Sequence, residues 1–173
     1  MDRLWSPWRS QYIQTFGTEQ EGKGCVFCEA LASSDDDARY LVRRHAFCFT
    51  MLNLYPYNSG HLLIIPYQHT GSYAELSRDT YTEMTELLRD WMHVLETVMH
   101  PQGFNIGSHV GRVGGAGIDQ PVHMHIVPRW NGDANFMPVI ADTKVISESM
   151  DDTMRKLRAA FDARDVRYSD PER

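Results

Sequence analysis

The segment IDQPVHMHIVPRW, residues 118–130, alternates apolar and polar side chains, which is typical of a β-strand. Successive side chains of a strand point to opposite faces, so one face of this strand carries an apolar row. That row is Val122, Met124 and Ile126. His123 and His125 share the other face, as a catalytic pair, as two metal ligands or as part of an ordinary solvent-exposed face.

The composition limits the classes of protein to which the chain can belong. Its 173 residues are enough for one domain with a core, and 42% hydrophobic and 23% charged residues are ordinary globular values. The net charge of −6 disfavours a general nucleic-acid-binding surface. The longest apolar run, HLLIIP at 61–66, is far shorter than the roughly 18 to 20 residues of a membrane helix. Since the N-terminal sequence does not resemble an export signal, we expect a cytoplasmic protein without membrane or nucleic-acid partners.

Hydrophobic periodicity predicts two helices. Ser77 is a good N-cap, and apolar residues recur behind it at three- and four-residue steps until Pro101 and Gly103 end the pattern. The apolar stripe consists of Tyr81, Met84, Leu87, Leu88, Trp91, Val94, Leu95 and Val98. A second, shorter amphipathic helix follows near the C-terminus. Its apolar residues are Met150, Met154, Leu157 and Phe161.

Strands are predicted around the first of these helices. Residues 40–53 have strand character in two pieces around His45, and 61–66 follow the turn sequence YPYNSG. FNIG at 104–107 starts another strand before a Gly-rich loop. This order predicts an α+β fold, in which one long and one short helix pack on one side of an antiparallel sheet.

No internal repeat and no linker between domains is visible in the sequence. We therefore expect residues 1–173 to form a single domain. Residues 1–24 are expected to form an N-terminal arm packed on this domain. Residues 163–173 are expected to form a polar C-terminal tail.

The chain has three cysteines, Cys25, Cys28 and Cys48. An odd number in a chain without an export signal disfavours a disulfide framework. Cys25 and Cys28 form a CxxC pair, which is half of a zinc site, a redox pair or a coincidence. His69 is a candidate for a further zinc ligand. A thioredoxin-like pair would open a longer helix than the one expected here, so zinc is favoured over redox chemistry.

Two histidines that face the same way can transfer a nucleotidyl group. Neutral imidazole is a nucleophile near pH 7, since its free pKa is about 6.5. Attack on an α-phosphate gives a nucleotidyl-imidazole, while the second histidine donates to a phosphoryl oxygen as charge develops. The Gly-rich loop at 111–120 lets backbone N–H groups approach a phosphate, although it fits neither the P-loop nor the GxGxxG pattern. His45 and His109 lie beside predicted strand ends, where a structural role is favoured over a catalytic one.

Several motifs, taken together, resemble the histidine triad superfamily, whose motif His-φ-His-φ-His-φ-φ usually runs into Pro-Arg. The matching stretch is PVHMHIVPR, residues 121–129. CVFC, MLNLYPYNSGHLLIIPYQH and FNIGSHVGRVGGAGI precede it in the same order as in the family. LWSPWRSQYI and PRWNGDANFMPV are similar to the branch that contains bacterial diadenosine tetraphosphate phosphorylases. The resemblance covers about residues 4–162.

The resemblance implies a compact α+β fold, usually homodimeric, that transfers or hydrolyses nucleotidyl groups. The middle histidine of the motif is the nucleophile, and the spacing to Pro-Arg places His123 there and His125 third. The resemblance also implies which residues line the nucleotide pocket and the phosphate side. These are Asn53 and His61 for the pocket, and Asn105, Gly107 and the Gly117 region for the phosphate side.

Pro121 departs from the family pattern, because it stands where the first histidine of the motif belongs. In zinc-bearing members this residue is the fourth metal ligand. The resemblance therefore implies Cys25, Cys28 and His69 as zinc ligands here, with a fourth position that proline cannot fill. Water, Asp119 or another group would have to complete the tetrahedron, which is the pattern of an open zinc site.

The sequence thus predicts an enzyme that cleaves dinucleoside polyphosphates, with inorganic phosphate or water as the second acceptor. We hypothesise that the carbonyl of Pro121 accepts a hydrogen bond from Nδ1–H of His123 and so directs Nε2 toward phosphorus. Two alternatives remain open. One is the same chemistry on adenosine phosphoramidates or in nucleotidyl transfer to a sugar phosphate. The other is a non-catalytic nucleotide-binding module, in which Pro121 marks the loss of activity.

Overall fold

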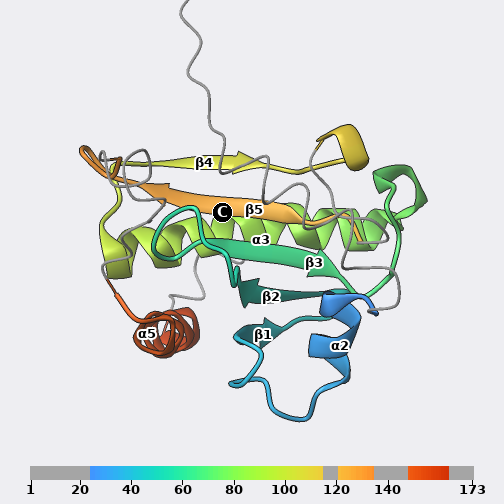
Figure 1. Ribbon diagram of the computed structural model, residues 1–173, viewed down its shortest axis with the longest axis horizontal. Helices are drawn as coiled ribbons and strands as arrows, with labels where there is room; N and C mark the ends of the chain where they lie inside the picture. The colour runs from blue at the N-terminus through green and yellow to red at the C-terminus, as the bar shows by residue number, and fades with distance from the viewer. Residues whose placement is uncertain (1–23, 115–120, 135–147, 164–173) are drawn as a thin grey trace, which may run out of the picture.

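The computed structural model describes residues 24–114, 121–134 and 148–163. Figure 1 shows one sheet with helices packed against it. Apart from Gly24 and Ala163, the expected N-terminal arm and C-terminal tail lie outside the described residues, and so does Gly117.

Five strands form one antiparallel sheet in the order β1-β2-β3-β5-β4. They are β1 (Leu41–Arg44), β2 (Cys48–Leu52), β3 (Leu62–Pro66), β4 (Gly103–Gly107) and β5 (Met124–Arg129). All the predicted strands are present, and the predicted α+β class is confirmed. Because β5 pairs with β3 on one side and β4 on the other, the strand that carries His125 lies inside the sheet.

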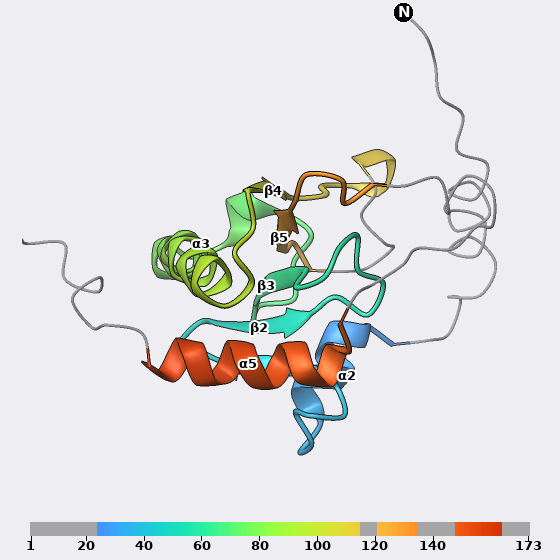
Figure 2. The same cartoon turned by 90° about the vertical axis from the view of Figure 1, so that its left-hand side faces the viewer.

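Two helices cover one face of the sheet, as predicted, and a third covers the opposite face. They are α3 (Arg78–Met99), α5 (Met150–Ala163) and α2 (Val26–Ala32). α3 and α5 contact each other and share one apolar core with the sheet, whereas α2 packs in a separate cluster. Figure 2 shows α3 and α5 next to each other beside the strands. Two 3₁₀ turns, η1 (Tyr73–Glu75) and η2 (Arg112–Gly114), lie in the connections. A short helix after the CxxC pair was expected, but its packing on the second face was not predicted, since seven residues are too few for a clear apolar period.

α3 begins and ends where the sequence predicts. Ser77 Oγ accepts a hydrogen bond from the backbone N–H of Thr80 at 3.1 Å, and His100 ends the helix in the left-handed conformation with φ 48°. Tyr81 departs from the predicted stripe, because it lies in the first turn and is 51% exposed. The stripe residues that are buried are Met84, Leu87, Trp91, Val94 and Leu95. Within the described ranges, no helix has both the length and the apolar character required to cross a membrane.

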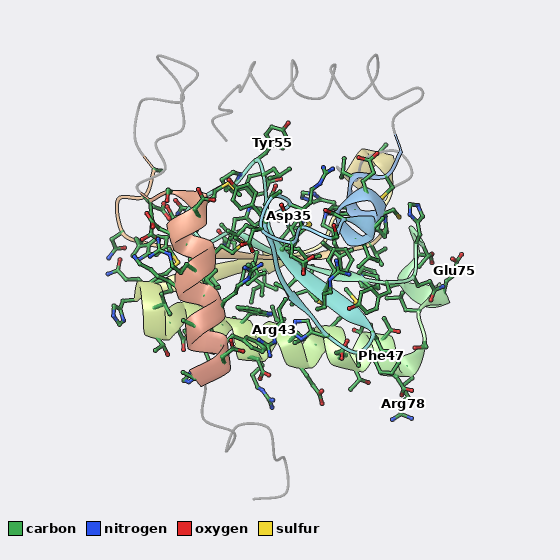
Figure 3. The ribbon with its side chains drawn as sticks, turned by 90° about the horizontal axis from the view of Figure 1, so that it is seen from below. Asp35, Arg43, Phe47, Tyr55, Glu75 and Arg78 are labelled. Carbon is green, nitrogen blue, oxygen red and sulfur yellow. The ribbon has the colours of Figure 1, made fainter. Side chains whose placement is uncertain are left out.

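Polar contacts fix the two long helices against the sheet. Trp91 Nε1 of α3 donates to Thr50 Oγ1 of β2 at 2.9 Å, and both residues are fully buried. Arg158 of α5 donates to the carbonyl oxygen of Leu41 in β1 at 2.6 Å. Arg43 of β1, labelled in Figure 3, forms an ion pair with α5. The first of these contacts pairs two buried polar groups that would otherwise be costly, and the other two join α5 to β1 at the margin of this face.

The opposite face carries α2 and the two histidines of the motif. Met124 and Ile126 pack toward α3, while the His123 ring contacts Phe27 of α2 at a centroid distance of 5.1 Å. The predicted alternation is therefore present. His123 and His125 are only 5% and 7% exposed, which excludes an ordinary solvent-exposed face.

Candidate active site

His61 is positioned by the tight turn that precedes β3. Gly60 has φ +72°, and a Cβ at this position would lie 2.6 Å from Met99 Sδ of α3, so the turn requires glycine. The backbone N–H of Asn53 donates to the His61 carbonyl at 2.9 Å across the turn. The turn predicted from YPYNSG thus brings a fully buried His61 to the face that carries the motif histidines.

A backbone amide determines which nitrogen of His61 carries the proton. The N–H of Tyr57 lies 3.1 Å from His61 Nδ1, and because an N–H only donates, Nδ1 must accept. The proton of the neutral ring is then on Nε2. The side-chain amide nitrogen of Asn53 is 3.4 Å from the same Nδ1 and favours the same tautomer.

The tautomer of His61 in turn determines that of His125. His61 Nε2 donates to His125 Nδ1 at 2.9 Å in the protein interior, so His125 carries its proton on Nε2. Among the described residues, His125 Nε2 is the buried side-chain nitrogen or oxygen without a hydrogen-bond partner. A buried donor that lacks a partner is costly, and it is explained if it serves to bind an oxygen of a ligand.

Burial keeps these rings neutral. Desolvation, followed by the charges of neighbouring histidines, lowers the pKa of His61 to about 4 and that of His125 to about 3. The centroid of the His125 ring lies 5.1 Å from that of His61 and 4.8 Å from that of His123. We call these three residues the histidine cluster. At neutral pH its central ring, His125, is a hydrogen-bond donor rather than a cation.

His123 has the complementary arrangement of proton and lone pair. Its Nδ1 lies 2.9 Å from the carbonyl oxygen of Pro121, and because a carbonyl only accepts, the ring proton is on Nδ1. The hypothesised contact is therefore present, and it requires no side chain at position 121. Burial lowers the pKa of His123, although its hydrogen bond to Pro121 opposes the shift. A neutral ring with its lone pair on Nε2 follows.

The histidine cluster therefore combines two nitrogens of opposite character in adjacent rings. His123 Nε2 has a lone pair available for attack on an electrophile. His125 Nε2 carries a proton that can stabilise an oxygen as it gains negative charge. This combination suits transfer of a phosphoryl-type group, in which a nucleophile and an oxyanion donor are needed on the same side of the substrate.

Of the residues predicted for the phosphate side, Gly107 lies next to the histidine cluster, whereas Asn105 has contacts elsewhere. Gly107 is the cross-strand partner of His125 and lies beside it. Asn105 is on the same face of β4 by strand alternation. However, its Oδ1 accepts a hydrogen bond from Arg129 Nη1 at 2.5 Å, and Arg129 also donates to Asp133 at 2.6 Å. The contacts described for Asn105 therefore place it in a polar network at the end of β5.

Cys25, Cys28 and His69 are brought together as the sequence predicts. Their ligand atoms all lie within 4.8 Å of one another, and Cys28 Sγ is 3.1 Å from His69 Nδ1. These distances fit three ligands around one ion. Pro121 lines the same hollow as Cys28 and His69, so the place implied for a fourth ligand adjoins these two but offers no side-chain donor atom.

Three ring contacts of the cluster were not predicted. Phe27 packs on His123, Tyr57 stacks on His125 at 6.1 Å, and the His109 ring lies 4.7 Å from that of His125. The contacts of Phe27 and Tyr57 could not be predicted from the sequence, because they depend on how α2 and a loop fold back. His109 was placed beside a predicted strand end, but its contact with His125 depends on the pairing of β4 with β5.

The depressed pKa values predict a pH dependence of stability. At pH values between the unfolded pKa of about 6.5 and the lower pKa values of the folded protein, the unfolded chain binds more protons than the folded protein. The contribution of these histidines to the free energy of unfolding is therefore complete above pH 6.5 and is lost as the pH falls toward 4. Each such histidine contributes a slope of up to about 1.4 kcal/mol per pH unit. Urea unfolding between pH 7 and 5 should therefore show a shallower slope for His125→Gln than for the wild type. The exposed His93→Gln is the matched control, and an unchanged slope in His125→Gln would contradict the assignment.

A family model described as HIT domain matches residues 38–132. AP-4-A phosphorylase from Mycobacterium tuberculosis is 33% identical over 162 residues, which are 91% of this chain and 83% of that protein. Adenosine 5′-monophosphoramidase from Schizosaccharomyces pombe is 26% identical over 107 residues, which are 62% of this chain and 75% of that protein.

A solved structure agrees with this similarity at the level of the fold. The Zn-bound histidine triad family protein from Mycobacterium smegmatis has a TM-score of 0.65 and 23% identity, covering 81% of this chain and 94% of that chain. The family model matches more than half of the chain, and the matched residues include all five strands and both histidines of the motif. The chain belongs to the histidine triad family, whose conserved unit is the HIT domain.

Proposed function

We propose that the protein cleaves dinucleoside polyphosphates at the α-phosphate through a nucleotidyl-His123 intermediate. The observation that carries this proposal is the unprotonated Nε2 of His123 beside the unpartnered Nε2–H of His125. The similarity to AP-4-A phosphorylase over most of both chains supports the substrate class. The reaction is then a double displacement on phosphorus.

The first displacement forms the bond between His123 Nε2 and the α-phosphorus as the bridging P–O bond to the remaining nucleotide breaks. His125 Nε2–H donates to a non-bridging oxygen, where negative charge increases. The Pro121 carbonyl accepts a hydrogen bond from Nδ1–H and so supports the positive charge that develops on the His123 ring. In the second displacement, inorganic phosphate releases the nucleotidyl group as ADP, or water releases it as AMP.

The remaining predicted residues have supporting roles in this proposal. Asn53 and His61 border the nucleotide pocket, and His61 also holds the tautomer of His125. Gly107 lies beside His125 without a side chain that would obstruct the phosphates. Asn105 is proposed to act on the phosphate side after it exchanges its partner Arg129. Gly117 keeps the role implied by the resemblance.

A second candidate substrate is an adenosine phosphoramidate, which the similarity to the Schizosaccharomyces pombe monophosphoramidase supports. It uses the same nucleophile and the same donor and differs in the leaving atom, nitrogen instead of oxygen.

We also propose a homodimer. Its support is β4, which pairs on one side only among the described strands and which, with the residues that follow it, exposes the apolar side chains of Ile106 and Val110.

Product analysis with diadenosine tetraphosphate tests the proposed function. ADP and ATP that appear only with inorganic phosphate would establish a phosphorylase, and AMP and ATP in its absence would establish a hydrolase. We expect His123→Ala to lower turnover by a factor on the order of 10³ or more and to abolish the nucleotidyl-protein adduct in mass spectrometry. His93→Ala is the control. Undiminished turnover in His123→Ala would disprove the assignment of the nucleophile.

We further propose that Cys25, Cys28 and His69 hold a zinc ion. Support comes from the proximity of their ligand atoms and from the similarity in fold to a Zn-bound family member. Bound zinc would supply a cross-link between the start of α2 and the segment after β3. Because Phe27 of α2 packs on His123, this cross-link would help hold the nucleophile in place.

The zinc proposal predicts a measurable stoichiometry. We expect about one zinc per chain by elemental analysis of protein purified without chelator, and a lower melting temperature after chelation, since a ligand bound to the folded state adds stability. Cys28→Ser and His69→Ala should both lose the metal. Cys48→Ser is the matched control, because Cys48 is buried in the α3 core and should leave the zinc content unchanged. Equal zinc content in all variants would overturn the proposal.

A further inference from the structure

His109 lies at the histidine cluster but has no part in the hydrogen bonds described above. It follows β4 by two residues, and its ring is tilted by 49° on that of His125 at a centroid distance of 4.7 Å. This is a shorter separation than those of His125 from His61 or His123. Unlike those buried rings, His109 is half-buried and therefore reaches both the cluster and the solvent.

The chain on the N-terminal side of His109 is held in place. Ser108 Oγ is 2.5 Å from Tyr73 Oη, which belongs to the 3₁₀ turn η1. Before it, Gly107 is paired with His125 at the end of β4. Two neighbouring contacts thus fix the backbone from which the His109 side chain extends. A ring at a fixed distance from the site is what proton transfer requires.

None of the three buried histidines is available to protonate the leaving group. His123 provides the lone pair, His125 provides a hydrogen bond through Nε2, and His61 must keep its Nε2 proton to maintain the tautomer of His125. The pKa values of all three are lowered, in part by the proximity of His109. A group that gives its proton to the departing atom of the substrate must therefore come from outside these three.

We propose that His109 is a further catalytic residue, the general acid that protonates the leaving group. This role rests on the proposed function. As the bond between His123 Nε2 and phosphorus forms, the bridging bond breaks, and the departing oxygen or nitrogen takes the proton of the His109 imidazolium. His109 is then neutral. In the second displacement it accepts the proton of the attacking water or hydrogen phosphate, and the original state is restored.

This role can be tested with two substrates, one whose leaving group must be protonated and one whose leaving group need not be. The p-nitrophenyl ester of AMP has a leaving group that departs as a stable anion, whereas adenosine 5′-phosphoramidate must gain a proton before ammonia leaves. In single-turnover experiments, we expect His109→Asn to slow phosphoramidate cleavage about a hundredfold and to change ester cleavage less than about threefold. Tyr73→Phe should show a smaller difference in the same direction. His93→Asn should react like the wild type with both.

The outcomes separate the two proposals. An equal loss with both substrates in His109→Asn, or no loss with either, would overturn the role of His109 and leave the proposed function intact. If His109→Asn fails to fold, Tyr73→Phe decides, and equal effects on both substrates there would count against the role. If the wild type reacts with neither substrate, or if His123→Ala reacts as well as the wild type, the proposed function fails and the role of His109 falls with it.

Discussion

The chemistry proposed for this site depends on one hydrogen bond, from the backbone N–H of Tyr57 to Nδ1 of His61. An amide cannot accept a hydrogen bond, so this contact fixes the tautomer of His61 and, through it, that of His125. The carbonyl of Pro121 fixes the opposite tautomer in His123. Two main-chain groups thus place a lone pair and a donor proton in adjacent rings. Neither contact depends on the side chain at position 121, so both are compatible with proline where the family motif has histidine.

Burial makes this arrangement persist at neutral pH. Desolvation lowers the pKa values of the cluster, so its rings stay neutral and keep the tautomers that the main chain imposes. The fold provides that burial by using both faces of one sheet. α3 and α5 close one face, and α2 brings Phe27 onto His123 on the other. The CxxC pair lies at the start of the same short helix, which connects the proposed zinc site with the proposed nucleophile His123.

Much of this molecule could be predicted from its sequence, because its strongest signals are local. The cap at Ser77 and the apolar stripe behind it predicted α3, and the alternation around His123 and His125 predicted their shared face. The features that could not be predicted depend on contacts between distant segments. The side of the sheet on which α2 packs, the protonation of each ring and the approach of His109 to His125 follow from strand pairing and loop geometry rather than from spacing.

The central claim is that main-chain contacts set the tautomers of the cluster. Long-range ¹H–¹⁵N NMR spectra of the histidine side chains at pH 7 report directly which ring nitrogens carry protons. The account predicts protons on Nε2 of His61, on Nε2 of His125 and on Nδ1 of His123, and an unprotonated Nε2 in His123. A proton on His123 Nε2 would contradict it, because the nitrogen assigned to attack phosphorus would then have no lone pair available.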